Sequence, residues 1–119
     1  MSAEPRKSYG RGEIWLVNLN PNRGNEPGKI RPALVVQTDH LNGEGHPTCL
    51  VCPISSQQHR ENILRLPITI NGLDKNSFIL VDQVRSIDVD KRFLQLLGTI
   101  SPHTQNQVDL GLRLVFNLL

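Results

Sequence analysis

The sequence lacks several features that would assign a small protein to a class. It contains no uninterrupted apolar run of the roughly 18 residues that a membrane span requires, and its polar start lacks the apolar stretch of a secretory signal. Its formal net charge is only +2, far from the strong basic bias of a protein that holds nucleic acid by charge alone. We therefore expect a cytoplasmic protein without a membrane anchor, in which any site for a polyanion is local.

Aromatic residues and cysteines are also scarce. Phe, Trp and Tyr make up 4% of the chain, so stacking on nucleobases cannot be its main source of affinity for RNA or DNA. The two cysteines, Cys49 and Cys52, form a C-x-x-C without the two further ligands of a structural zinc site. Residues three apart in a strand point to opposite faces, so we interpret both as small core residues and expect no metal and no cofactor.

The length of 119 residues fits one compact domain. Residues 1–10 are polar, include Pro5 and show no core-forming pattern, which predicts a flexible N-terminal tail. Residues 11–119 are predicted to form a single domain. The chain contains no Walker loop, no H-E-x-x-H and no G-x-S-x-G, so composition and general motifs indicate only a small β-rich domain.

Short strands separated by turn-forming residues dominate the predicted domain. β-branched and aromatic residues predict strands at 13–19, 31–38, 48–55, 64–70, 77–87 and 96–100, with a single helical turn at 90–93. The loop from Asn20 to Lys29 is rich in turn formers, and Asn71-Gly72 is a favoured turn dipeptide. This pattern is typical of a mainly β (α+β) fold, such as a small barrel.

A C-terminal helix is predicted to close the domain. Ser101 is a good N-cap, Pro102 suits the first helical position, and apolar residues recur at helical spacing from Val108 onward. Gly111, in the middle of this segment, costs roughly 1 kcal/mol relative to alanine. Apolar residues lie on more than one side of the helix, so we expect it to pack on the barrel and also on a second surface, most simply a second copy of the chain.

Three segments, in order, resemble the motifs of one protein family. The first is N-P-N-R-G-N-E at 20–26, followed by R-P-A-L-V-V at 31–36. The second is V-C-P-I-S-S-Q at 51–57, and the third is V-D-Q-V-R-S-I-D at 81–88. R-P-A-L-V-V alone would be a weak signal, whereas three motifs in order are specific. On these motifs the chain resembles the MazF/PemK family of bacterial toxin endoribonucleases over residues 12–119.

The resemblance implies both a fold and a function. The implied fold is a small SH3-like, CcdB/PemK-like barrel with a C-terminal α-helix. The implied protein is the toxin of a type II toxin-antitoxin system, a homodimer that binds single-stranded RNA and is neutralised by a MazE-like antitoxin. The implied activity is that of an mRNA interferase: metal-independent, sequence-specific cleavage by attack of the RNA's own 2′-hydroxyl, which leaves 2′,3′-cyclic phosphate and 5′-hydroxyl ends.

The family's catalytic pair, an arginine and a hydroxyl residue, corresponds by motif to Arg31 and Ser55. Serine replaces the usual threonine and keeps the hydroxyl, and Ser56 is a rival for the same role. A guanidinium can donate two parallel hydrogen bonds to the phosphorane oxygens, and the hydroxyl can add a third. Arginine is a poor base near neutrality, so we assign Arg31 to transition-state stabilisation and leave the base open. The structural alternative is an ion pair of Arg31 with Glu26 or Asp82.

Further candidates lie around this pair. Glu26 could orient the guanidinium or contact a base. Substrate binding is also predicted for polar residues near strand ends that should border the groove: Ser56, Gln57, Gln83 and Arg85. The alternatives are a solvated loop charge for Glu26 and a surface arginine on a strand for Arg85. His59, four residues after Ser55, is a further candidate base, although a loop histidine is more often a surface residue.

Two functions from other classes remain open. A non-enzymatic toxin with the same barrel, like the related CcdB proteins, would bind DNA gyrase and would not need Arg31 or Ser55. A plain RNA-binding barrel would bind RNA and leave it whole. The three motifs resemble the ribonuclease branch more closely than either alternative.

Overall fold

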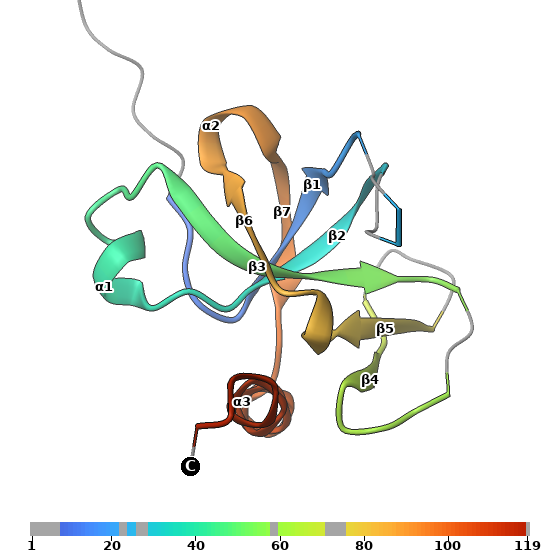
Figure 1. Cartoon of the computed structure of the whole chain (residues 1–119). Helices are drawn as coiled ribbons and strands as arrows, with labels where there is room; N and C mark the ends of the chain where they lie inside the picture. The colour runs from blue at the N-terminus through green and yellow to red at the C-terminus, as the bar shows by residue number, and fades with distance from the viewer. Residues whose placement is uncertain (1–7, 22–23, 26–28, 58–59, 71–75, 119) are drawn as a thin grey trace, which may run out of the picture.

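Short antiparallel strands and one long helix make up the structure (Figure 1). It is a computed structural model that describes residues 8–21, 24–25, 29–57, 60–70 and 76–118. The elements, in order, are β1 (Glu13–Asn18), β2 (Ile30–Val35), α1 (Asp39–Asn42), β3 (Thr48–Ser55), β4 (Arg65–Ile68), β5 (Ser77–Leu80), the 3-10 helix η1 (Val81–Gln83), β6 (Arg85–Asp88), α2 (Val89–Arg92), β7 (Phe93–Thr99) and α3 (Pro102–Phe116). The predicted mainly β fold with a C-terminal helix is confirmed.

Strand β3 organises the sheet. Within the described residues the sheet has seven strands: six pair along the path β4-β5-β3-β2-β1-β7, and β6 pairs with β3 off this path. On one side β3 pairs with β2, and on the other it pairs first with β6 and then with β5. Pro53 pairs with Ala33 of β2 and lies between the β6 and β5 segments on the other side, so its missing N–H interrupts neither of those ladders.

The single strand predicted for residues 77–87 is wrong, because η1 divides it. Ile54 pairs with Ile79, and an unbroken strand would then place Val51 opposite Asp82. Val51 instead pairs with Arg85, three residues further along the chain. The three residues of η1 take up this difference in register. No helix was predicted between the strands at 31–38 and 48–55, but α1 forms there, with Thr38 as its N-cap.

Both faces of the central strands are buried, which explains their nearly continuous apolar sequences. Ala33 and Val35 of β2 lie in one core cluster, whereas Leu34 lies in another. The two cysteines divide in the same way, Cys49 in the first cluster and Cys52 in the second, so the prediction of two separate core residues is confirmed. Burial raises the pKa of each thiol to about 12, which makes both cysteines unreactive near neutral pH.

The folded domain begins earlier than the sequence suggests. Tyr9 is buried in the first core cluster, its ring lies 5.5 Å from that of Phe93, and its hydroxyl donates to the His46 carbonyl at 2.6 Å. The prediction that the flexible tail extends to residue 10 is therefore wrong for Tyr9. Residues 1–7 lie outside the described residues.

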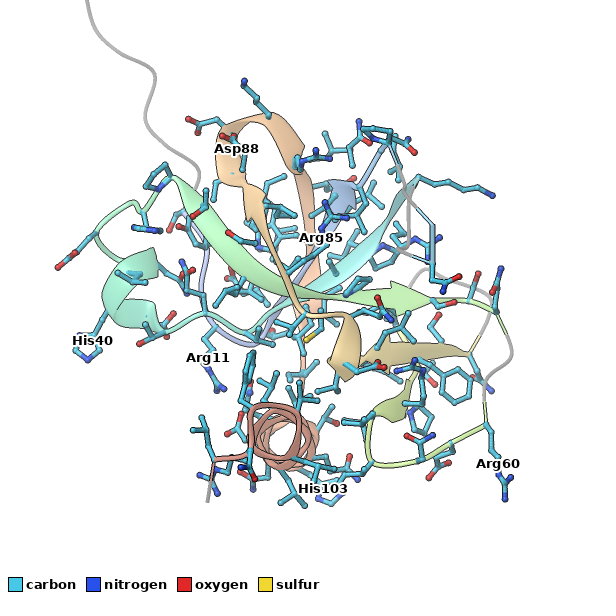
Figure 2. The ribbon with its side chains drawn as sticks, in the orientation of Figure 1. Arg11, His40, Arg60, Arg85, Asp88 and His103 are labelled. Carbon is cyan, nitrogen blue, oxygen red and sulfur yellow. The ribbon has the colours of Figure 1, made fainter. Side chains whose placement is uncertain are left out.

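Arg11 ties this first segment to α3 (Figure 2). Its Nη2 donates to Asp109 Oδ1 at 2.6 Å, and its Nε donates to the Val36 carbonyl at 3.2 Å. Gln105 donates to the same carboxylate oxygen of Asp109 at 2.9 Å. Burial raises the pKa of Asp109, but the hydrogen bonds from Arg11 and Gln105 outweigh it, and the pKa lies below its usual 3.8.

This lowered pKa predicts an acid-dependent loss of stability. Asp109 contributes stability above its unfolded-state pKa of about 3.9, and this contribution is lost as pH falls through the lower folded-state value. Urea unfolding of Asp109→Asn should therefore show lower stability than the wild type at pH 6, with the difference shrinking below about pH 4. Glu44→Gln, at an exposed carboxylate, is the control and should follow the wild type. A difference for Asp109→Asn that does not change with pH would contradict the assignment.

Helix α3 has the predicted caps. Ser101 Oγ accepts the Thr104 N–H at 3.2 Å, Pro102 occupies the first turn, and Asn117 ends the helix in the left-handed conformation at φ 56°. The helix lies beside η1 under the sheet, with Val108 fully buried (Figure 1). No helix in the described part of the chain is long and apolar enough to cross a membrane.

Gly111 is explained by the close approach of α3 to its neighbours. A Cβ at this position would lie 2.9 Å from the Ile63 carbonyl oxygen and 3.1 Å from Val81 Cγ1. Gly111→Ala should therefore destabilise the protein by about 1–3 kcal/mol through overpacking, although alanine alone would stabilise the helix by about 1 kcal/mol. Asn106→Ala, at an exposed helical position, is the matched control and should be neutral or slightly stabilising in urea titrations. Equal gains in stability from both substitutions would show that a Cβ at position 111 fits without overpacking.

Candidate active site

A cleft of about 540 Å³ opens where β2 and β3 part. Its lining brings together residues from the end of the long loop, from the four strands β1, β2, β3 and β5, and from the segment after β3: Leu16, Lys29, Ile30, Arg31, Pro32, Ile54, Ser55, Ser56, Gln57 and Ser77. Four of the residues predicted from the motifs, Arg31, Ser55, Ser56 and Gln57, therefore share one cleft.

The pairing of β2 with β3 explains why Arg31 and Ser55 line the same cleft. The recorded pairs end at Ala33 opposite Pro53. Continuing this register by two residues places Arg31 opposite Ser55, and directly opposed residues project from the same face of a sheet. Pro32 cannot donate a ladder hydrogen bond, which is consistent with the pairing stopping just before it. The cleft lies where the ladder ends, so residues from both faces line it.

Arg31 provides a partly desolvated cation in this cleft. Burial lowers the pKa of the Arg31 guanidinium below its usual value. An arginine keeps its charge in proteins, and partial removal of water strengthens its attraction for an anion. Asp82, one of the two ion-pair partners considered for Arg31, pairs with Arg65. The other, Glu26, lies outside the described residues.

Ser55 is held by a local turn at the end of β3. Its side chain is buried, and its Oγ accepts the backbone N–H of Gln57 at 3.1 Å. This bond uses a lone pair of the hydroxyl oxygen and not the hydroxyl hydrogen. Ser56 and Gln57 are exposed at the same cleft. The arrangement distinguishes a buried, oriented hydroxyl at Ser55 from an exposed one at Ser56.

The other predicted site residues lie elsewhere. Gln83 belongs to η1 and Arg85 to β6, and neither lines the cleft; Figure 2 shows Arg85 beside β6. Two other histidines, His40 on α1 and His103 on α3, also lie outside the cleft lining (Figure 2). His59, the histidine considered as a base, lies outside the described residues.

Two polar residues of the cleft, Lys29 and Ser77, were not predicted from the sequence. Lys29 had been treated only as the end of a polar loop, and its place two residues before Arg31 was the signal that could have identified it. Ser77 is buried at the start of β5, next to Phe78, which pairs with Ser55. Nothing in the local sequence around Ser77 indicates this position, because it depends on the register of β5 against β3.

The chemistry of the cleft suits an oxyanion. Its polar groups include a guanidinium, an ammonium and three serine hydroxyls, all of which can donate hydrogen bonds to phosphate oxygens. Among the described residues, no group of three or more His, Cys, Asp or Glu side chains is arranged to hold a metal ion.

The fold is that of the MazF toxins. The structure matches the crystal structure of MazF (Form-I) from Deinococcus radiodurans with a TM-score of 0.78 and 22% identity, covering 94% of this chain and 99% of that chain. It matches the Mycobacterium tuberculosis toxin MazF-mt6 with a TM-score of 0.73 and 19% identity, covering 90% and 98%. A mycobacterial endoribonuclease solved in complex with its cognate antitoxin matches with a TM-score of 0.72 and 14% identity, covering 94% and 96%.

The sequence defines the family more closely. Residues 10–116 match the family model described as PemK-like, MazF-like toxin of type II toxin-antitoxin system. The chain belongs to this family of toxins. The resemblance found from the three motifs is confirmed.

Proposed function

We propose that this toxin is a metal-independent endoribonuclease that cleaves single-stranded RNA at specific sequences. The observation that supports this most strongly is the cleft shared by Arg31 and Ser55, a partly buried cation beside a buried and oriented hydroxyl. Such a pair can stabilise the negative charge that develops when a phosphodiester is attacked. The substrate implies a cytoplasmic location.

The proposed reaction uses the RNA's own 2′-hydroxyl as the nucleophile. The 2′-oxygen bonds to phosphorus while the bond from phosphorus to the 5′-oxygen breaks. The 2′-hydroxyl loses its proton, the 5′-oxygen gains one, and the ends are a 2′,3′-cyclic phosphate and a 5′-hydroxyl. Arg31 donates two parallel hydrogen bonds to the non-bridging oxygens, and Ser55 donates a third. The base that removes the proton is not assigned to a residue.

The remaining polar residues are proposed to bind the RNA. Ser56 and Gln57 are exposed at the cleft and suited to contact the sugar or a base near the cut. Gln83 and Arg85 are proposed as contacts outside the cleft lining. Glu26, which lies outside the described residues, is proposed as a further contact. A MazE-like antitoxin would inhibit by occupying the cleft or by displacing the loop that ends at Lys29.

A homodimer is proposed through α3. Several apolar side chains at the end of the chain are more than half exposed: Leu110, Leu114, Phe116 and Leu118. A second groove, of about 310 Å³, runs beside Phe116 and Leu118 and includes Leu50. Exposed apolar side chains gathered on one helix are typical of a protein interface.

Wild-type protein should therefore be a dimer at micromolar concentration in light scattering, and the double variant Leu110→Glu/Leu114→Glu should be a monomer. These two residues are one helical turn apart and share a face, so both charges would enter the interface. Leu94→Glu, at an exposed leucine of β7, is the control and should remain dimeric. A monomeric wild type would contradict the proposal.

The test of the proposed activity is incubation of the purified protein with long single-stranded RNA in excess EDTA. We expect discrete fragments. Intact RNA together with inhibition of DNA gyrase would support the CcdB-like alternative, and RNA that is bound but uncut would support a plain binding protein.

A further inference from the structure

Lys29 has an unusual backbone conformation for a lysine. Its φ is 66°, in the left-handed region, and Asn117 at the end of α3 is the other described non-glycine residue with a positive φ. The left-handed region is unfavourable for residues with a Cβ, and glycine adopts it readily. Strained backbone of this kind concentrates at functional sites, where the surrounding structure holds it in place.

Hydrogen bonds that join the two ends of the loop hold Lys29 in this conformation. Its N–H donates to Asn20 Oδ1 at 2.7 Å, and its carbonyl accepts the Leu19 N–H at 2.8 Å. Arg92 of α2 donates to the Asn18 carbonyl at 2.9 Å and to the Asn20 carbonyl at 2.7 Å. These bonds all involve the Lys29 backbone or its neighbours, so they fix the residue without using its ammonium group.

The Lys29 side chain is exposed and lines the cleft that contains Arg31. The two ion pairs recorded among the described residues are Arg11 with Asp109 and Arg65 with Asp82, and neither involves Lys29. A fixed backbone that would suit glycine therefore presents a cation to the cleft.

We propose that Lys29 binds a second phosphate of the RNA, next to the phosphate that Arg31 holds. Consecutive residues of extended chain are about 3.3 Å apart, so positions 29 and 31 are separated by a distance comparable to that between successive phosphates of an extended strand. The inference rests on the proposed function, because it needs RNA in this cleft. Lys29 would add affinity that does not depend on sequence and would leave the rate of the chemical step unchanged.

The test measures binding of mixed-sequence RNA with every 2′-hydroxyl methylated, which prevents cleavage, over a range of salt concentrations. For Lys29→Gly, the slope of log affinity against log salt should fall by about 0.7, the value for one phosphate contact on a single strand. This corresponds to roughly eightfold weaker binding at 50 mM salt if both proteins bind alike at 1 M. Lys29→Arg should retain the wild-type slope.

Two further readouts separate binding from folding and catalysis. Lys29→Gly should melt at the same temperature as the wild type or higher, because glycine relieves the strained φ. With cleavable RNA its KM should rise while kcat stays unchanged. Lys91→Gln removes the same charge from the exposed surface of α2, outside the cleft lining, and should leave the salt slope unchanged.

An unchanged slope for Lys29→Gly, with a wild type that binds and cleaves RNA, would overturn the role of Lys29 and leave the proposed function intact. A reduced slope in a protein that does not cleave RNA would support the phosphate site and overturn the cleavage activity. A wild type that binds no RNA would overturn both.

Discussion

Arg31→Ala is expected to lower the rate of RNA cleavage by roughly 10³-fold or more. Removing one hydrogen-bond donor to a developing oxyanion typically costs about 10²–10³ in rate, and the guanidinium is proposed to supply two such bonds. Arg31→Lys should be intermediate, because it keeps the charge and loses the paired geometry. Single-turnover cleavage of a defined RNA would measure all three rates.

The control for Arg31 is the thermal midpoint of each variant. If the arginine served mainly to hold the loop in place through an ion pair with Glu26, Arg31→Ala would lower the thermal midpoint. At temperatures below that midpoint, the variant would then cleave RNA within tenfold of the wild-type rate. A folded variant with normal stability and a lost chemical step is the result that the cleft geometry predicts.

Ser55→Ala is expected to lower the cleavage rate by about 10²–10³, the typical effect of removing one donor to the transition state. Ser55→Thr should retain activity within about tenfold, because it keeps the hydroxyl and restores the residue that the family usually has. The matched control is Ser56→Ala, which removes an exposed hydroxyl that is proposed to bind RNA, so its cleavage rate at saturating RNA should stay close to that of the wild type.

The reverse outcome for the two serines would assign the catalytic hydroxyl to Ser56. The structure favours Ser55, since it is buried at the end of β3 and oriented by the Gln57 N–H. A large loss in both variants would instead indicate that the turn after β3, rather than one hydroxyl, is required.

The elements that follow from local sequence were predicted well. The N-cap at Ser101 and the strand at 48–55 occur as expected, because capping chemistry and β-branched runs act within a few residues. The break at η1 was missed because it depends on the register of two strands against β3. The need for glycine at 111 was missed for a similar reason, since it arises from contact with Ile63 and Val81.

The candidate site was likewise predicted only in part, because some of its residues depend on contacts between distant segments. Motif order identified Arg31 and the segment from Ser55 to Gln57, and the structure places all of them in one cleft. Lys29 was not predicted, because its place in the cleft lining depends on the path of the loop backbone. Arg85 lies outside the cleft lining because it pairs with Val51, whereas the cleft lies at the far end of β3, and no local pattern reveals this pairing. Gln83, in η1, lies outside the lining as well.

The most direct test of the central claim compares two RNA oligonucleotides that differ by one oxygen atom. Both contain the mapped cut site, and one has a 2′-deoxynucleotide immediately 5′ of the scissile phosphate. In excess EDTA, the all-ribose RNA should be cut to a 2′,3′-cyclic phosphate and a 5′-hydroxyl, and the deoxy-substituted RNA should stay whole. Equal cleavage of the two would show that another nucleophile attacks the phosphate and would contradict the proposed mechanism.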